Sequence, residues 1–146
     1  MQVSCGVIYK NYKILLVKKA YGDYKDKWEF PGGKRDNSDK SIKSGLQREL
    51  KEELNCDSVI HDLIHFMKIK KQDINLPQDL LLYFYNVYLV TNTITLSKEH
   101  TEFKWVTFEE AKTMDLIKWD YKLLKMFEDY FNEDYFTADL LAKLDD

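Results

Sequence analysis

The sequence predicts an α+β fold in which a mixed β-sheet packs between helices. Two observations support this prediction. Apolar runs with β-branched members recur along most of the chain, and helical repeats occur at three separate places. The expected order is three strands, a helix, four strands and two helices, followed by an extra short C-terminal helix. We expect a single domain over residues 1–146, because a chain of this length can bury one sizeable core.

The first strands follow from short apolar runs separated by turn residues. Residues 3–9 and 14–17 are such runs, and the polar segment 10–13 between them predicts a hairpin. Residues 28–30 form a third, shorter run, which we expect to stop at Pro31-Gly32-Gly33.

The main helix is expected to end near Leu54. Ser38, Asp39 and Ser41 are all candidates for its N-cap, and Asn55 suits the left-handed position at its C-terminal end.

The second half of the chain contains four more expected strands and the remaining helices. The strands are expected at residues 59–70, 80–91, 93–96 and 103–106, with a turn at 75–78. The helices are expected at residues 109–114, where Thr107 can act as the cap, at 119–131 and at about 133–144.

Composition limits the class of protein. Apolar residues make up 45% of the chain and charged residues 32%, which is typical of a globular protein, and no apolar run is long enough to cross a bilayer. Cys5 and Cys56 have no metal-ligand spacing, so we expect two buried thiols and a reducing, cytoplasmic location. The net charge of −3 gives no general attraction to duplex nucleic acid.

The main helix is expected to carry three closely spaced carboxylates. Glu49, Glu52 and Glu53 are spaced i, i+3 and i+4, so they share one helix face. Carboxylates this close together repel one another, but their arrangement becomes favourable if a divalent cation lies among them. Oxygen-only ligands indicate Mg²⁺ or Mn²⁺. The alternative is an ordinary surface helix whose acidic residues are balanced by Arg48 and Lys51.

Residues 48–53 (RELKEE), with Gly33 before them, resemble the Nudix box, G-x5-E-x7-R-E-U-x-E-E-x-G-U. Residues 28–34 (WEFPGGK) look like the segment that leads into this box in MutT-type proteins. Downstream, Glu99 precedes Trp105 by six residues and Asp120 follows it by fifteen, and both spacings match the MutT-like pattern. The resemblance covers roughly residues 3–130, with the box at about residues 33–56.

The chain departs from the box in two ways. The interval from Gly33 to Arg48 holds one residue more than the box allows, and Asp39 or Lys40 stands where the mid-box glutamate is expected. We expect the loop to bulge so that Asp39 takes the place of that glutamate near Arg48. The terminal glycine of the box is Asn55, a mild change because asparagine tolerates a positive φ.

The resemblance implies a metal-dependent hydrolase that cleaves a nucleoside diphosphate linked to a further group. It implies Mg²⁺, with Mn²⁺ possible, and Arg48 as the residue that orients the carboxylates. Glu53 or Glu49 is the candidate general base, and Glu99 is the third candidate. The implied metal ligands are Gly33, Glu49, Glu52, Glu53 and Glu99.

Substrate recognition is assigned to another group of residues. Asp120 is expected to contact the base, and its alternative role is that of a solvated residue near the start of a helix. Trp28, Tyr83 and Tyr85 could stack on a base, although aromatic residues are more often part of the core. Lys34, which ends the segment leading into the box, is also expected to bind substrate. The three histidines have no metal-ligand spacing and are expected to be ordinary surface or core residues.

Three functions are compatible with these residues. The favoured one is a MutT-like nucleoside triphosphate pyrophosphohydrolase, which releases a nucleoside monophosphate and pyrophosphate from an oxidised purine such as 8-oxo-dGTP or from a CTP or dCTP-type nucleotide. The second is a Nudix hydrolase of ADP-ribose, a dinucleoside polyphosphate or an RNA cap. ADP-ribose enzymes of this family commonly carry a proline well after the box, whereas this chain has none beyond Pro77. The third is a catalytically weak nucleotide sensor. Either a monomer or a homodimer is compatible with the sequence.

Overall fold

The computed structural model describes residues 1–91 and 93–128, which divide into two compact units. The first unit consists of Met1–Ile8 and Pro31–Ser97, and the second of Tyr9–Phe30 and the described part of Lys98–Asp146. Each unit is described by itself below. None of the helices among the described residues is long and apolar enough to cross a membrane.

The first unit is built on a mixed sheet with the strand order β4-β1-β6-β5. Its strands are β1 (Gln2–Lys10), which contributes its residues up to Ile8, β4 (Gly32–Lys34), β5 (Ser58–Ile69) and β6 (Leu80–Leu89). The β1–β6 pairing is parallel and the other two pairings are antiparallel. This mixture of strand directions, together with the helices, confirms the predicted α+β class.

Strand β4 was not expected, because the sequence predicted that Pro31-Gly32-Gly33 would only end the preceding strand. Instead, Gly32, Gly33 and Lys34 pair with Cys5, Ser4 and Val3 of β1. Glycine carries no side chain whose pattern could reveal a strand, and this pairing joins segments far apart in the sequence.

Helix α1 (Ile42–Leu54) begins and ends as its local sequence predicts. Of the three candidate caps, Ser41 is the one used, since its side chain accepts from the Ser44 backbone N–H. Asn55 closes the helix in the left-handed conformation, with φ of 55°. The apolar stripe of Leu46, Leu50 and Leu54 is fully buried, so packing of this face holds the helix in place.

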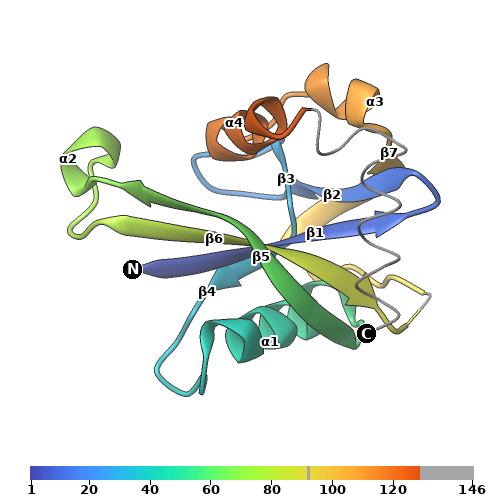
Figure 1. Ribbon diagram of the computed structural model, residues 1–146, viewed down its shortest axis with the longest axis horizontal. Helices are drawn as coiled ribbons and strands as arrows, with labels where there is room; N and C mark the ends of the chain where they lie inside the picture. The colour runs from blue at the N-terminus through green and yellow to red at the C-terminus, as the bar shows by residue number, and fades with distance from the viewer. Residues whose placement is uncertain (92, 129–146) are drawn as a thin grey trace. The chain divides into compact units, whose positions relative to one another are not determined.

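The two long strands β5 and β6 lie side by side and are joined through the short helix α2 (Lys71–Ile74) (Figure 1). The turn predicted at 75–78 starts where α2 ends, at Asn75, which adopts the left-handed conformation. The strand predicted at 93–96 is wrong. The Thr95 N–H donates to the Leu54 carbonyl and the Ser97 N–H to the Glu53 carbonyl. This segment therefore provides hydrogen-bond donors for carbonyl groups at the C-terminal end of α1.

The second unit contains the strands β2 (Lys13–Lys19), β3 (Trp28–Glu29) and β7 (His100–Val106). Strand β2 pairs with the end of β1 in the predicted hairpin, where Asn11 and Tyr12 adopt positive φ, and it also pairs with β3 and β7. Helix α3 (Phe108–Lys112) is capped by Thr107, as expected.

Helix α4 (Lys118–Met126) corresponds to the helix predicted at 119–131, whose last residues lie outside the described part of the chain, as does the helix predicted at 133–144.

Candidate active site

The glycine pair of β4 sits so close to its neighbours that a side chain at Gly32 would overlap backbone atoms, and one at Gly33 would force the Glu49 carboxyl group to move. Gly32 has φ of +155°, and a Cβ built there would overlap the Ser4 carbonyl of β1. A Cβ on Gly33 would overlap the carboxyl group of Glu49. The loop therefore brings bare backbone directly against a carboxylate of α1.

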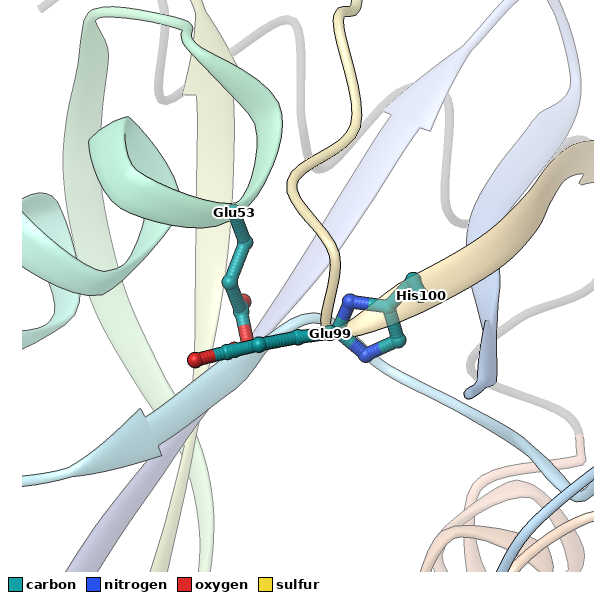
Figure 2. Close-up of side chains that lie close together, drawn as sticks. All are labelled: Glu53, Glu99 and His100. Atoms are coloured by element: carbon teal, nitrogen blue, oxygen red, sulfur yellow. The ribbon is translucent and has the colours of Figure 1, made fainter. Parts of the chain in front are cut away.

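The three carboxylates of α1 occupy different environments. Glu53 is only 3% exposed and accepts a hydrogen bond from the Gly32 N–H, with 2.9 Å between N and Oε2. Figure 2 shows Glu53 projecting from the last turn of α1. The Glu49 side chain is 13% exposed, whereas that of Glu52 is 55% exposed. One carboxylate is thus buried, one partly covered and one open to solvent.

Arg48 connects the helix carboxylates with the loop before the helix. Its Nη1 lies 3.1 Å from a Glu49 oxygen and 3.2 Å from both Glu52 oxygens, and its Nη2 donates to the Lys34 carbonyl at 3.0 Å. These acidic neighbours, and Asp39 first among them, raise the pKa of Arg48 further above its already high ordinary value. Arg48 therefore stays charged and limits the positions that Glu49 and Glu52 can take.

Asp39 supplies the strongest contact of Arg48. Arg48 Nε donates to Asp39 Oδ1 at 2.9 Å and Arg48 Nη2 to Oδ2 at 3.0 Å, a two-pronged pair of the kind that fixes a guanidinium most firmly. The Arg48 guanidinium, followed by the Asp36 backbone N–H, holds the pKa of Asp39 below its usual value. The expected approach of Asp39 to Arg48 is confirmed, and Lys40 does not take this place.

The residues of this cluster fit a divalent cation. All the side-chain donors are carboxylate oxygens, which suits Mg²⁺ or Mn²⁺ rather than softer metals. The space that a Cβ of Gly33 would fill is taken by the Glu49 carboxyl group, so backbone and side-chain oxygens can approach one ion together.

An open hollow of about 360 Å³ lies beside this cluster, in the same unit. Its lining combines three basic side chains with two carboxylates. The lining residues are Lys34, Arg35, Asp36, Asn37, Arg48 and Glu49. Lys34, which the sequence assigned to substrate, is exposed here, so its ammonium group is accessible to a phosphate.

In the second unit, Asp120 is a buried acid in the first turn of α4. It is 5% exposed and accepts a hydrogen bond from the Phe30 N–H, with 2.8 Å between N and Oδ2. Burial raises the pKa of Asp120 well above its ordinary value, against the opposing effect of the Phe30 N–H, and the charge of Glu29 raises it further. The alternative of a solvated surface residue is therefore wrong, and burial favours the neutral form of Asp120 more than in an exposed aspartate.

Two of the three candidate stacking residues, Trp28 and Tyr85, are more covered than a stacking role suggests. Trp28 is 8% exposed, and the ammonium groups of Lys18 and Lys104 lie 5.8 and 5.5 Å from its ring centroid. Tyr85 is 7% exposed and has Lys43 of α1 over its ring at 5.9 Å. Tyr83 is partly exposed and lies next to another aromatic ring, that of Phe66, with 5.0 Å between centroids.

Glu99 and His100 come at the start of β7 (Figure 2). Glu99 immediately precedes the strand, and its carbonyl accepts from the Ala20 N–H, which fixes this end of β7 beside β2. His100 is buried, and its Nε2 lies 2.9 Å from a Glu29 oxygen. No sequence pattern indicates this His100–Glu29 contact, because the two residues lie far apart in the chain.

Two further residues of the first unit contact Asp39 or lie beside it, and the sequence did not predict a role for either. Arg35 donates to both the Gln2 side chain and the Asp39 carbonyl, and Gly45 of α1 lies directly under the Asp39 carboxylate. No motif indicates either residue, since each matters only through the position that the loop takes in space.

Comparison with known proteins gives a family match over most of the chain. The family model described as NUDIX domain matches residues 1–127, which include residues of both units. The CTP pyrophosphohydrolase of Escherichia coli (strain K12) is 30% identical over 130 residues, covering 87% of this chain and 90% of that protein. Nudix hydrolase 5 of Arabidopsis thaliana is 30% identical over 113 residues, covering 74% of this chain and 36% of that protein.

Solved structures show the same fold. The solution structure of the E. coli ORF135 protein matches with a TM-score of 0.73 and 26% identity, covering 90% of each chain. The crystal structure of the MutT protein from Methanosarcina mazei Go1 matches with a TM-score of 0.75 and 24% identity, covering 91% of this chain and 96% of that one.

Proposed function

The chain belongs to the Nudix family, whose members hydrolyse pyrophosphate bonds, and we propose that it is a nucleoside triphosphate pyrophosphohydrolase releasing a nucleoside monophosphate and pyrophosphate. The observation that carries this proposal is the bare backbone of Gly33 placed against Glu49, beside Glu53 and the arginine-held carboxylates of α1. A cluster of this kind fits the phosphate end of a nucleotide. We further propose that residues 1–146 form one Nudix domain in the cytoplasm.

In this proposal, Glu49, Glu52 and Glu53 hold Mg²⁺ or Mn²⁺, together with the Gly33 carbonyl. Such an ion neutralises the negative charge of the phosphates. Glu99 is proposed as an additional ligand on the basis of its spacing to Trp105 in the sequence.

Side chains of this protein are proposed to act as the general base, to orient the carboxylates and to bind a phosphate. Glu53 is the preferred general base, because the Gly32 N–H fixes one of its carboxyl oxygens and so sets the direction of the other; Glu49 and Glu99 are the alternatives. Arg48 keeps Glu49 and Glu52 from turning away from the loop. Lys34 is proposed to bind a phosphate in the neighbouring hollow.

We infer the preferred base from the hydrogen-bonding groups of Asp120. A neutral carboxyl group offers one donor and one acceptor side by side. Cytosine presents the matching pair through its N3 acceptor and N4 donor, and an 8-oxopurine through its O6 acceptor and N7–H donor. On the edge that carries N7, unmodified guanine presents two acceptors, O6 and N7, and pairs poorly there. We therefore propose CTP-type nucleotides and 8-oxo-dGTP as the substrates to be tested first.

The competing function of a catalytically weak nucleotide sensor is motivated by the altered loop and the missing mid-box glutamate. It is less well supported because Asp39 lies against Arg48, where that glutamate is expected. The tyrosines and Trp28 remain candidates for stacking, and Asp120 is preferred as the contact to the base because its carboxyl group can form directional hydrogen bonds and its spacing to Trp105 matches the MutT-like pattern.

The test is a screen of purified protein with Mg²⁺ against CTP, dCTP, 8-oxo-dGTP, dGTP, ADP-ribose and a dinucleoside polyphosphate, with products separated by chromatography. We expect a monophosphate and pyrophosphate from a cytidine nucleotide or 8-oxo-dGTP, and a slower reaction with dGTP. Cleavage of ADP-ribose alone would contradict the proposal.

A further inference from the structure

The loop between Gly33 and Arg48 holds one residue more than the family box and carries an aspartate where the box carries a glutamate. An aspartate side chain is one methylene group shorter than a glutamate side chain, so the loop backbone must come closer to the helix for the carboxylate to reach Arg48. In the structure it does so, with both oxygens of Asp39 bound to Arg48 and the Asp39 side chain only 5% exposed.

The close approach depends on Gly45. A Cβ built at Gly45 would lie 2.8 Å from Asp39 Oδ2, nearer than carbon and oxygen atoms normally come. Glycine is otherwise a poor residue inside a helix, because alanine in the same place stabilises the helix. Gly45 does not have a positive φ that would require glycine, so room for the Asp39 carboxylate is what the structure shows glycine to provide here.

Arg35 fixes the loop from its other side. Its Nη1 donates to Gln2 Oε1 at 3.1 Å and its Nη2 to the Asp39 carbonyl at 3.2 Å, while its backbone N–H donates to the Gln2 carbonyl at 2.9 Å. The loop is thereby tied to the first residue of β1. The Asp36 N–H also donates to Asp39 Oδ2, which sets the orientation of the carboxylate.

We propose that Arg35 and Gly45 are positioning residues that hold Asp39 against Arg48 and so keep the metal-binding carboxylates of α1 in place across a loop of altered length. Arg35 acts on Asp39 through its hydrogen bond to the Asp39 carbonyl, and Gly45 through the space it leaves for the Asp39 carboxylate. This inference rests on the proposed function for its metal site, but it concerns the free protein and can be measured without any nucleotide.

The first experiment measures Mn²⁺ binding to the free protein by electron paramagnetic resonance, together with the melting temperature. Gly45→Ala should weaken Mn²⁺ binding by about tenfold, because the new methyl group displaces Asp39, while the melting temperature stays equal or rises by about 3 °C through better helix propensity. A structural defect alone would lower the melting temperature as well. Gln47→Ala, an exposed substitution on the same helix, serves as the control and should leave Mn²⁺ binding unchanged.

A double variant makes the result decisive. In Asp39→Ala the carboxylate is gone, so adding Gly45→Ala should raise the melting temperature without any further loss of Mn²⁺ binding. Independent, additive losses from the two substitutions would overturn the inference, as would a Gly45→Ala protein that binds Mn²⁺ like the wild type.

Arg35 is tested by comparing Arg35→Ala with Arg35→Lys. Alanine removes both side-chain hydrogen bonds and should weaken Mn²⁺ binding by about threefold to tenfold, whereas lysine can keep one of them and should restore part of the affinity. Lys13→Ala, which removes an exposed positive charge in the other unit, controls for charge alone. Equal effects of Arg35→Ala and Lys13→Ala would show that Arg35 does not position Asp39. If Mn²⁺ binding follows this pattern but no nucleotide is cleaved, only the proposed function fails.

Discussion

The backbone N–H of Gly32 donates to Oε2 of Glu53 across 2.9 Å, and this contact joins the glycine loop to the last turn of α1. Glu53 is buried, and one of its oxygens is held by a group that cannot move without shifting β4. The carboxylate therefore reaches its position before any substrate arrives, which is what a general base or a metal ligand requires.

Glu53→Gln should lower kcat by about 10²-fold or more, because the amide cannot accept a proton as a base and is a weaker metal ligand. The glutamine oxygen can still accept from the Gly32 N–H, so the melting temperature should change little. Steady-state kinetics and thermal unfolding measure the two effects. Glu109→Gln, at an 80% exposed side chain on α3, is the matched control. A Glu53→Gln enzyme with near-normal kcat would mean that Glu53 is only a structural acceptor.

Turnover should depend on Mg²⁺ or Mn²⁺, because the crowded carboxylates of α1 and the phosphates of a nucleotide repel one another without a counter-charge. Excess EDTA should reduce the rate to background, and added Mg²⁺ should restore it. Undiminished hydrolysis in EDTA would rule out the metal site. Thermal unfolding provides a second measurement, since an ion that binds only the folded protein raises its melting temperature.

Asp39→Ala should weaken activity clearly, whereas Asp36→Ala should not. The Asp39 carboxylate makes two bonds to Arg48, at 2.9 and 3.0 Å, and is 5% exposed. Asp36 approaches Arg48 only to 3.5 Å and is 51% exposed. The two substitutions remove the same charge from the same loop, so a comparison of kcat isolates the position of the charge. Equal, small effects from both would show that Arg48 is held by other contacts.

Local features of this chain were predictable and close approaches were not. Helix α1 could be predicted because Ser41, Asn55 and the leucine stripe act within a few residues of one another. The approach of Asp39 to Arg48 is an exception, because it was implied by the resemblance to the Nudix box, in which a glutamate stands at this place. Strand β4 was missed because its pairing with β1 depends on residues distant in sequence, and the role of Gly45 because it becomes visible only when the Asp39 carboxylate lies above it.

Burial is the other property that the sequence left open. Asp120 had two interpretations of equal merit, as a contact to the base and as a solvated residue, and nothing in the local sequence distinguished them. Its burial depends on how α4 packs, and the Phe30 N–H that it accepts lies at the end of a distant segment.

The raised pKa of Asp120 should be visible in the stability of the protein. A carboxyl group that is harder to ionise in the folded protein binds more protons in the folded than in the unfolded state. The contribution of Asp120 to the free energy of unfolding therefore falls as the pH rises above the ordinary aspartate pKa of about 3.9. Asp120→Asn, which cannot ionise, should therefore be more stable than the wild type at pH 8, and the difference should vanish near pH 3. Urea unfolding at the two pH values measures this. A wild type that is the more stable protein at pH 8 would contradict a neutral Asp120.

Specificity provides the sharpest test of Asp120. Asp120→Ala should raise KM for the preferred nucleotide by roughly 10–100-fold, because it leaves the donor and acceptor of the base edge unpaired at a cost of about 1–3 kcal/mol. Asp120→Asn keeps one donor and one acceptor, and its oxygen can still accept from the Phe30 N–H, so its KM should stay closer to that of the wild type. The rates on non-cognate triphosphates should change far less in both variants, because the contacts to the phosphates remain. If Asp120→Ala leaves the ranking of nucleotide substrates untouched, the base is recognised elsewhere, and Asp120 serves only to join Phe30 to α4.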